Sequence, residues 1–277
     1  MSAEYRAALR ERGLEPLARV LELRESDPDQ PWLQTLSKPD LGGRSRWRVE
    51  LPGGERVVYL KRYARPKLRE QWDRIWRQNA WHSRAWWEHH QARVLAELRI
   101  PANRGVGFVE QMRGQFERRS AVVLERTPGE ACDRVWRRWV EAGDARTRGC
   151  ARHDFARRLA RFVAAFHGTG MCHRDLYLCH IFVEGPDSPD QAPRFALIDL
   201  ARTHRPRWRR TRWILKDLSQ VDASARQVGA SRADRFRFLL AYLGLQRGAA
   251  RARWFARRVA RRSDRILRRE ARKLRPS

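Results

Sequence analysis

The stretch that decides the fold is CHRDLYLCHIFV at residues 172–183, together with ALIDL at residues 196–200. Each contains a short run of β-forming residues, and the second run ends in the carboxylate of Asp199. The loop before the first run holds another carboxylate, Asp175, and five residues later the imidazole of His180. The sequence therefore predicts two buried strands whose adjacent loops carry polar groups suited to catalysis.

Phosphoryl transfer explains this combination of residue types, because the transferring group needs positioning and neutralisation of its charge. In the protein-kinase pattern, an Asp after His-Arg faces the acceptor hydroxyl, a metal ligand follows five residues later, and a second Asp binds Mg²⁺. Asp175, His180 and Asp199 occupy these three places. His180 is a departure, because protein kinases have Asn there and imidazole is a softer ligand than Mg²⁺ usually takes.

The run HRDLYLCHIF at residues 173–182 resembles the motif of the lipopolysaccharide core kinases, the Kdo/heptose kinase (WaaP-like) family. Protein kinases do not share its Tyr-x-Cys-His portion. The resemblance implies an α+β, protein-kinase-like two-lobe fold that uses ATP and Mg²⁺. We expect a small antiparallel β lobe at residues 1–126 and a mainly helical large lobe at residues 127–277.

The resemblance places further kinase elements upstream in a fixed order. Residues 41–51 resemble a degenerate phosphate-covering hairpin loop, in which Gly42 and Gly43 would let backbone N–H groups approach an anion. Residues 56–63 predict a strand, and Lys61 stands near its end, where kinases present a phosphate-binding lysine. Lysine is rare among the 60 basic residues, so a lysine at this position is more informative than it would otherwise be.

Two glutamates complete the expected ATP site. Residues 71–98 are a Trp-rich helical stretch in which Glu88 takes the place of the kinase helix glutamate, which pairs with the strand lysine. A solvated surface Glu is the alternative, because many arginines surround it. Residues 120–126 predict an apolar strand running into the connection between lobes, and Glu125 marks the expected adenine-binding edge. Any buried strand would look the same, so this assignment rests on position alone.

Three residues are expected to support Asp175 without touching substrate. His173 braces the backbone around Asp175, which is also what a core histidine would do. Arg174 is expected to pair with an acidic group. Asp217 is expected to anchor from below the loop that carries Asp175, which we call the catalytic loop. Neither Phe-Gly nor Ala-Pro-Glu follows Asp199, which argues against a protein kinase with a phosphorylated activation loop.

The net charge of +28 on 277 residues limits the partners to anions: nucleic acid, an anionic membrane or a phosphorylated glycolipid. The sequence has neither a run of about 18 apolar residues nor an apolar signal core after Met1. The four cysteines form no C-x-x-C pair, so neither a disulfide framework nor a structural zinc is indicated. These features favour reduced thiols and a cytoplasmic location.

Two segments combine arginine with large apolar residues. Residues 247–275 predict one or two basic amphipathic helices, which lie either at a membrane interface or with their apolar stripe on the large lobe. The tryptophans between residues 72 and 87, interleaved with arginines, are candidates to hold a sugar or acyl surface, with core packing as the default for most of them.

The resemblance implies an enzyme that phosphorylates a sugar hydroxyl, with heptose expected, of the lipopolysaccharide inner core. It would be cytoplasmic and peripheral to the inner face of the cytoplasmic membrane. Its expected partners are the lipopolysaccharide core or another anionic glycolipid and the anionic membrane surface, while nucleic acid is not expected. A kinase of another glycan, a small molecule or a protein is the first alternative. A non-catalytic RNA- or lipid-binding pseudokinase is the second, although Lys61, Asp175 and Asp199 are all present.

Overall fold

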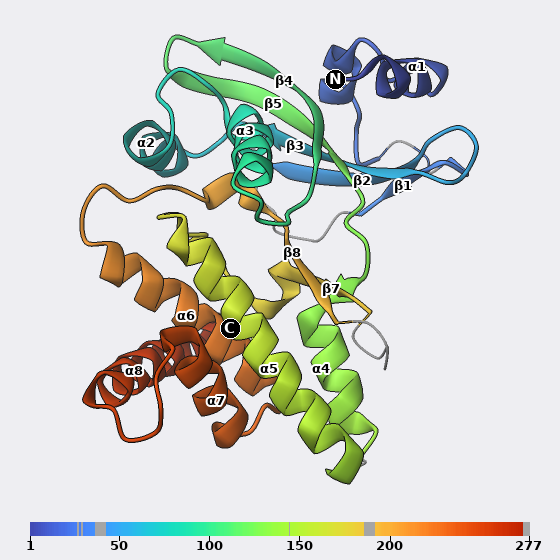
Figure 1. Cartoon of the computed structure of the whole chain (residues 1–277). Helices are drawn as coiled ribbons and strands as arrows, with labels where there is room; N and C mark the ends of the chain where they lie inside the picture. Colours follow the sequence, from blue (N-terminus) through green and yellow to red (C-terminus); the bar gives the residue numbers. More distant parts are fainter. Residues whose placement is uncertain (27, 29, 37–42, 144, 186–191, 274–277) are drawn as a thin grey trace. The chain divides into compact units, whose positions relative to one another are not determined.

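The computed structural model describes residues 1–26, 28, 30–36, 43–143, 145–185 and 192–273 (Figure 1). The chain divides into two compact units. Unit 1 comprises Met1–Thr127 and Asp199–Arg202, and unit 2 comprises Pro128–Ile198 and Thr203–Ser277. Unit 1 is built on a five-stranded antiparallel sheet and unit 2 is mainly helical, which confirms the predicted α+β class.

The sheet of unit 1 has the strand order β1-β2-β3-β5-β4. Its strands are β1 (Leu33–Thr35), β2 (Arg44–Glu50), β3 (Val57–Ala64), β4 (Gly105–Arg113) and β5 (Phe116–Glu125). The central strand β3 pairs with β2 and β5, and Lys61 lies opposite Arg46 on one side and Val122 on the other. Because side chains alternate along a strand, Lys61 and Tyr63 share one face of the sheet while Val58 and Leu60 share the other.

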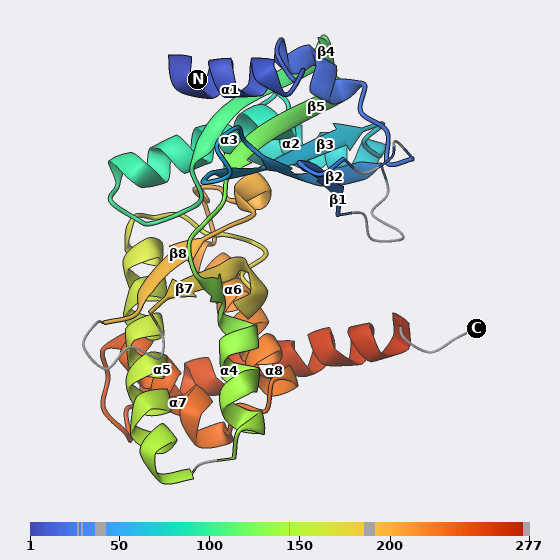
Figure 2. The ribbon, with the colours of Figure 1, turned by 90° about the vertical axis from the view of Figure 1, so that its right-hand side faces the viewer.

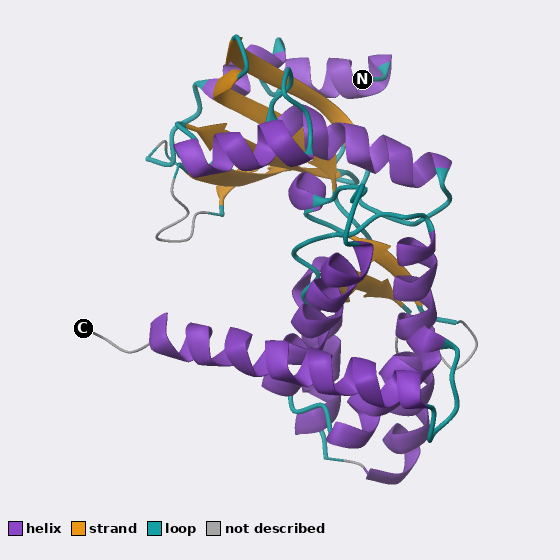
Figure 3. Ribbon diagram, turned by 90° about the vertical axis from the view of Figure 1, so that its left-hand side faces the viewer, coloured by secondary structure: helices purple, strands orange, loops and turns teal. Residues whose placement is uncertain are grey.

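The two faces of this sheet are covered by different helices (Figures 2 and 3). On one face α1 (Ala3–Glu11) and the 3-10 helix η1 (Leu17–Leu21) join a core that includes Trp47 and Leu60. On the other face, Ala85 of α3 (Arg84–Glu97) and Ala201 of η3 (Leu200–Arg202) pack with Tyr63. The packing of η3 on this face explains why Asp199 belongs to unit 1.

The helical stretch expected at residues 71–98 is two helices, α2 (Leu68–Arg77) and α3. The break has a local cause, because the buried guanidinium of Arg74 donates to the carbonyls of Asn79 and His82 at 2.7 and 2.6 Å. The Ser83 hydroxyl then accepts the Trp86 N–H at 3.1 Å and caps α3. Core packing is also the wrong expectation for three tryptophans of this region, which are exposed: Trp72, Trp76 and Trp81.

Unit 2 consists of five α-helices and a three-stranded sheet within the described residues. The helices are α4 (Cys132–Glu141), α5 (Ala145–Gly168), α6 (Arg210–Gln227), α7 (Arg232–Leu243) and α8 (Ala250–Lys273). The strands are β6 (Glu130–Ala131), β7 (Ile181–Glu184) and β8 (Arg194–Leu197), and a 3-10 turn, η2 (Leu178–His180), precedes β7. The two strands predicted around residues 181 and 196 are β7 and β8, which pair antiparallel.

Gly129 shows why the chain needs glycine where it enters unit 2. Its φ is +83°, and a Cβ placed there would lie 2.2 Å from the carbonyl oxygen of Val183. Only glycine tolerates both this backbone conformation and this approach to β7.

The C-terminal helix α8 uses its apolar stripe inside unit 2. Ala252, Phe255 and Val259 are buried, and the Ser263 hydroxyl donates to the Ser219 carbonyl of α6 at 3.0 Å. Figure 2 shows the end of α8 running past the other helices of unit 2. Of the two expectations for this segment, packing of the stripe on the large lobe is the one observed. No helix among the described residues is long and apolar enough to span a bilayer.

Candidate active site

Three charged side chains meet on one face of the unit 1 sheet. Lys61 of β3 donates from Nζ to Glu88 Oε1 of α3 at 2.6 Å and to Asp199 Oδ1 at 3.2 Å. Glu88 is fully buried, so it is not the solvated surface glutamate of the alternative reading. The lysine therefore lies between two carboxylates, the arrangement that fixes a phosphate-binding lysine in kinases.

Tyr63 satisfies the second oxygen of Glu88, because its hydroxyl donates to Glu88 Oε2 at 2.9 Å. Burial, reinforced by the charges of Glu88 and Asp199, raises the pKa of Tyr63 well above its usual value of 10, so the phenol keeps its proton. Burial alone would lower the pKa of Lys61, but Asp199 and Glu88 outweigh burial and raise it. The ammonium group therefore stays charged throughout the physiological range.

The raised pKa of Lys61 predicts how this cluster contributes to stability. Folding favours the protonated lysine, so its contribution is fully present below the ordinary lysine pKa of 10.5 and is lost as pH rises through the higher folded value. Between about pH 7 and that pH, the difference in free energy of unfolding between wild type and Lys61→Met is expected to stay constant, and above it to shrink. Urea unfolding across pH measures this difference, with the exposed Lys67→Met as control. A difference already shrinking between about pH 7 and about pH 9 would contradict the raised pKa.

Asp199 is held in an uncommon backbone conformation. Its φ is +59°, in the left-handed region that non-glycine residues seldom adopt. Its second carboxylate oxygen, Oδ2, lies 3.5 Å from the guanidinium of Arg46 on β2. Such backbone strain persists where the surrounding contacts over-determine it, as the ion pairs of Asp199 do here.

Gly43 and Glu125, two further residues expected at the ATP site, are already used by contacts inside the fold. Gly43 has a φ of +80°, and a Cβ there would lie 2.3 Å from the Ala64 carbonyl oxygen, so the close approach to β3 already requires glycine. Gly42 lies outside the described residues. The carboxylate of Glu125 accepts the Tyr5 hydroxyl of α1, and its backbone N–H donates to the Arg104 carbonyl at 2.8 Å. The roles of these residues in binding ATP stay predictions.

In unit 2, Asp217 of α6 holds the start of the catalytic loop. Its buried carboxylate accepts the backbone N–H of His173 at 2.7 Å and that of Arg174 at 2.8 Å. His167 Nε2 lies 3.2 Å from the same carboxylate, and its Nδ1 lies 2.9 Å from the Tyr242 hydroxyl. Both carboxylate oxygens are thus used, which is the anchoring arrangement expected of Asp217.

Two further residues of α6 hold the loop, and the sequence analysis missed them. Gln220 Oε1 accepts the Leu176 N–H at 3.1 Å, and Ser224 Oγ accepts the Leu178 N–H at 3.0 Å. Together with Asp217 they are spaced by three and four residues, so one face of α6 binds the loop from its start to η2. The only signal in the sequence was polar residues at helical spacing, which does not by itself distinguish buried groups from solvent-facing ones.

This support presents Asp175 and His180 in defined geometry. Gln220 Nε2 donates to Asp175 Oδ1 at 3.4 Å, and His180 Nδ1 lies 2.7 Å from the Asp175 backbone carbonyl oxygen. Because a carbonyl oxygen can only accept, Nδ1 is the protonated nitrogen of this contact, and in the neutral form of the ring the lone pair is on Nε2. Ile198, the residue before Asp199, donates its N–H to the His180 carbonyl at 3.0 Å.

The contacts of His173 and Arg174 hold the loop in place. His173 is buried, and its Nε2 lies 3.0 Å from the Ile198 carbonyl oxygen, so the ring ties the catalytic loop to the end of β8. Arg174 adopts a φ of +69° and lays its guanidinium over the ring of Trp213, 5.3 Å from the centroid. Its carbonyl accepts from Lys216 and, at 3.3 Å, from Gln220. Both residues thus position the loop that carries Asp175.

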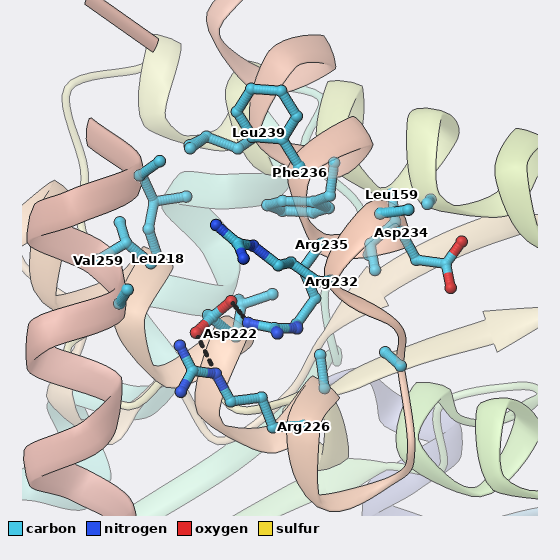
Figure 4. A pocket seen from close by; sticks show the side chains of 18 of the residues that line it. Leu159, Leu218, Asp222, Arg226, Arg232, Asp234, Arg235, Phe236, Leu239 and Val259 are labelled. Atoms are coloured by element: carbon cyan, nitrogen blue, oxygen red, sulfur yellow. Dashed lines mark hydrogen bonds and ion pairs between the residues drawn. The ribbon is translucent and has the colours of Figure 1, made fainter. Parts of the chain in front are cut away.

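A cavity of about 950 Å³ lies elsewhere in unit 2, among helices α5 to α8 (Figure 4). Its apolar walls include Leu159, Leu218, Phe236 and Val259. Asp222 at its side pairs with the arginines at positions 226 and 235, at 2.9 and 2.8 Å. Leu178, three residues after Asp175 on the same loop, also lines the cavity, but Asp175 itself does not.

Comparison of the sequence with known proteins identifies a family of kinases. The model of the lipopolysaccharide kinase (Kdo/WaaP) family matches residues 46–242. The lipopolysaccharide core heptose(I) kinase WaaP of Escherichia coli K12 is 27% identical over 161 residues, which are 57% of this chain and 59% of that protein. The enzyme of the same name from Pseudomonas aeruginosa PAO1 is 41% identical over 86 residues, 30% of this chain and 32% of that protein. The chain thus spans between a third and three-fifths of the length of these relatives.

A solved structure described as WaaP in complex with acyl carrier protein superposes with a TM-score of 0.60 at 24% identity. It covers 90% of this chain and 97% of the matched one. This likeness confirms the predicted protein-kinase-like fold. The match of the family model to residues 46–242, more than half of the chain, confirms the resemblance drawn from the HRDLYLCHIF motif: the chain belongs to the lipopolysaccharide kinase (Kdo/WaaP) family.

Proposed function

We propose that this protein is an ATP-dependent kinase that phosphorylates a heptose hydroxyl of the lipopolysaccharide inner core. The observation that carries the proposal is the presentation of Asp175, whose loop is bonded through four backbone N–H groups to one face of α6. A carboxylate held this rigidly suits proton abstraction from a hydroxyl. The names of the curated relatives support heptose as the acceptor sugar.

The chemistry follows from these side chains. The oxygen of the sugar hydroxyl attacks the γ-phosphorus of ATP, and the Asp175 carboxylate accepts the proton of that hydroxyl. The bond from the γ-phosphorus to the β,γ-bridging oxygen breaks, ADP leaves with that electron pair, and the phosphoryl group remains on the sugar. Lys61, fixed by Glu88, neutralises charge on the α- and β-phosphates.

Mg²⁺ fits the donor groups of the chain. Asp199 offers a carboxylate, the ligand type that Mg²⁺ prefers. His180 donates a hydrogen bond from Nδ1 to the Asp175 carbonyl oxygen, as metal-binding histidines commonly do. Its Nε2 is therefore suited to bind a metal or a metal-bound water. When bound, Mg²⁺ would supply positive charge beside the phosphates.

The proposed setting is the inner face of the cytoplasmic membrane, with the lipopolysaccharide core and the anionic lipid surface as partners. The net charge of +28 supports both, because each is anionic. Attachment through exposed charges would weaken with salt, since they are screened over about 8 Å at physiological ionic strength.

The test is transfer of label from γ-³²P-ATP with Mg²⁺ to enzymatically dephosphorylated rough lipopolysaccharide. Label is expected in the dephosphorylated acceptor, and much less in native rough lipopolysaccharide, whose core hydroxyls are already phosphorylated. ATP binding without label in the acceptor would transfer the proposal to another glycan, a small molecule or a protein. Absence of ATP binding would favour the pseudokinase alternative.

A further inference from the structure

Helix α2 is amphipathic, but its apolar face points away from unit 1. Leu68, Trp72 and Trp76 recur every fourth residue and are 70%, 51% and 78% exposed. Residues at this spacing line one face of a helix. The opposite face carries the buried polar residues Gln71 and Arg74. The usual arrangement of a surface helix, with apolar residues inward, is therefore reversed.

Specific hydrogen bonds fix this reversed orientation. Gln71 Nε2 donates to the Glu117 carbonyl of β5 at 2.6 Å, and Gln71 Oε1 accepts the Glu117 N–H at 3.2 Å. Arg74 binds the carbonyls of the loop between α2 and α3. Rotation of α2 to bury its tryptophans would break these bonds and leave buried polar groups without partners.

Apolar exposure is concentrated around this helix. Phe116 at the start of β5 contacts Trp72, with ring centroids 6.4 Å apart and planes at 84°. We call the surface formed by Leu68, Trp72, Trp76 and Phe116 the aromatic ridge. The described part of the chain exposes ten large hydrophobic residues, and the aromatic ridge with Trp81 accounts for five of them. An exposed apolar surface of this kind marks an interaction site.

The charge around the aromatic ridge is positive. Both acidic residues of α2 are paired with arginines. Glu70 pairs with Arg44 and Arg84, both at 3.0 Å, and Asp73 pairs with Arg77 one helical turn later. Three exposed cations stand at the N-terminal end of the helix: Arg65, Lys67 and Arg69. The partner of the ridge must therefore accept aromatic rings and offer anionic groups beside them.

We propose that the aromatic ridge is the membrane-contact surface of this protein and enters the headgroup region of an anionic phospholipid bilayer. Tryptophan favours that depth, and the cations of residues 65–69 would lie on the lipid phosphates. Helix α8 does not offer this combination, because its apolar stripe is buried in unit 2. The inference deepens the proposed function and rests on it only in that the acceptor is carried by a membrane.

The experiment measures binding of the full chain to phosphatidylglycerol and phosphatidylcholine vesicles by cosedimentation. Wild type is expected to prefer phosphatidylglycerol. Trp72→Ala with Trp76→Ala is expected to lower its partition coefficient about 100-fold, roughly tenfold for each ring. Trp208→Ala removes a tryptophan of unit 2 that is more exposed than Trp72 or Trp76, and it is expected to change binding less than about threefold. In wild type, lipids brominated near the headgroup are expected to quench tryptophan fluorescence, and less so in the double variant.

Two results would overturn the inference. The first is vesicle binding by the double variant equal to that of wild type; if this variant also loses binding to acyl carrier protein, the ridge is assigned to a protein partner. The second is complete loss of vesicle binding in the α8 variant Arg268→Ser with Arg269→Ser. Because both ridge tryptophans are exposed, circular dichroism and unfolding are expected to match wild type. Activity on a deacylated, water-soluble core oligosaccharide separates the two proposals, since the double variant keeps it and a failed kinase assignment removes it from wild type too.

Discussion

Replacement of Asp175 by asparagine is expected to lower the turnover number for phosphoryl transfer about 10³-fold, while the affinity for ATP changes less than about threefold. Asparagine has nearly the same shape and can still accept from Gln220 through its amide oxygen, so the loop geometry is preserved. It cannot accept the proton of the sugar hydroxyl. The loss therefore falls on the chemical step, and label transfer with equilibrium ATP binding measures the two effects separately.

The matched control for this prediction is Asp154→Asn, which alters a partly exposed aspartate paired with Arg158 on α5. This control is expected to leave turnover and ATP affinity unchanged. If Asp175→Asn kept more than about a tenth of the wild-type turnover, Asp175 would not be the general base. If it abolished ATP binding instead, the residue would act on the nucleotide rather than on the acceptor.

The catalytic loop could be predicted because its information is local. The spacing of Asp175, His180 and Asp199 along the chain, with β-forming residues after His180 and before Asp199, was enough to predict β7 and β8. Lys61 was recognised by its place near the end of a strand and by the rarity of lysine in the chain. The β-forming residues of each strand directly adjoin the group that they identify.

The supports of the loop could not be predicted in the same way. Gln220 and Ser224 bind backbone groups more than forty residues earlier in the chain. Hydrogen bonds to backbone N–H groups place no demand on the residue type at the other end, so no motif records them. Only Asp217 was found, because the family resemblance supplied it.

Helix α2 shows a different limit of sequence reasoning. The period of Leu68, Trp72 and Trp76 identifies a helix face correctly, but periodicity does not say which way the face points. The direction is set by hydrogen bonds from Gln71 and Arg74 to the β4–β5 hairpin, and from Arg74 to the loop between α2 and α3. Polar side chains satisfied by backbone carbonyls can replace apolar packing when each bond is made.

Replacement of Asp217 by alanine is expected to lower the free energy of unfolding by about 3–5 kcal/mol. The change leaves the buried N–H groups of His173 and Arg174 without their acceptor and removes the carboxylate that faces His167. Chemical denaturation measures the loss. Asp264→Ala is the matched control, because Asp264 is 48% exposed and pairs with Arg226, and we expect a loss below about 1 kcal/mol there.

A comparison of Asp217→Ala with Asp217→Asn separates anchoring of the loop from general stability. Asp217→Asn keeps one acceptor oxygen, so it is expected to recover part of the stability while placing an amide donor against a backbone N–H. If Asp217 positions the catalytic loop, turnover measured well below the unfolding temperature should fall more than tenfold in both variants, with little change in ATP affinity. Normal turnover in a folded Asp217→Ala protein would contradict this role, and Gln220 and Ser224 would then be sufficient to hold the loop that carries Asp175.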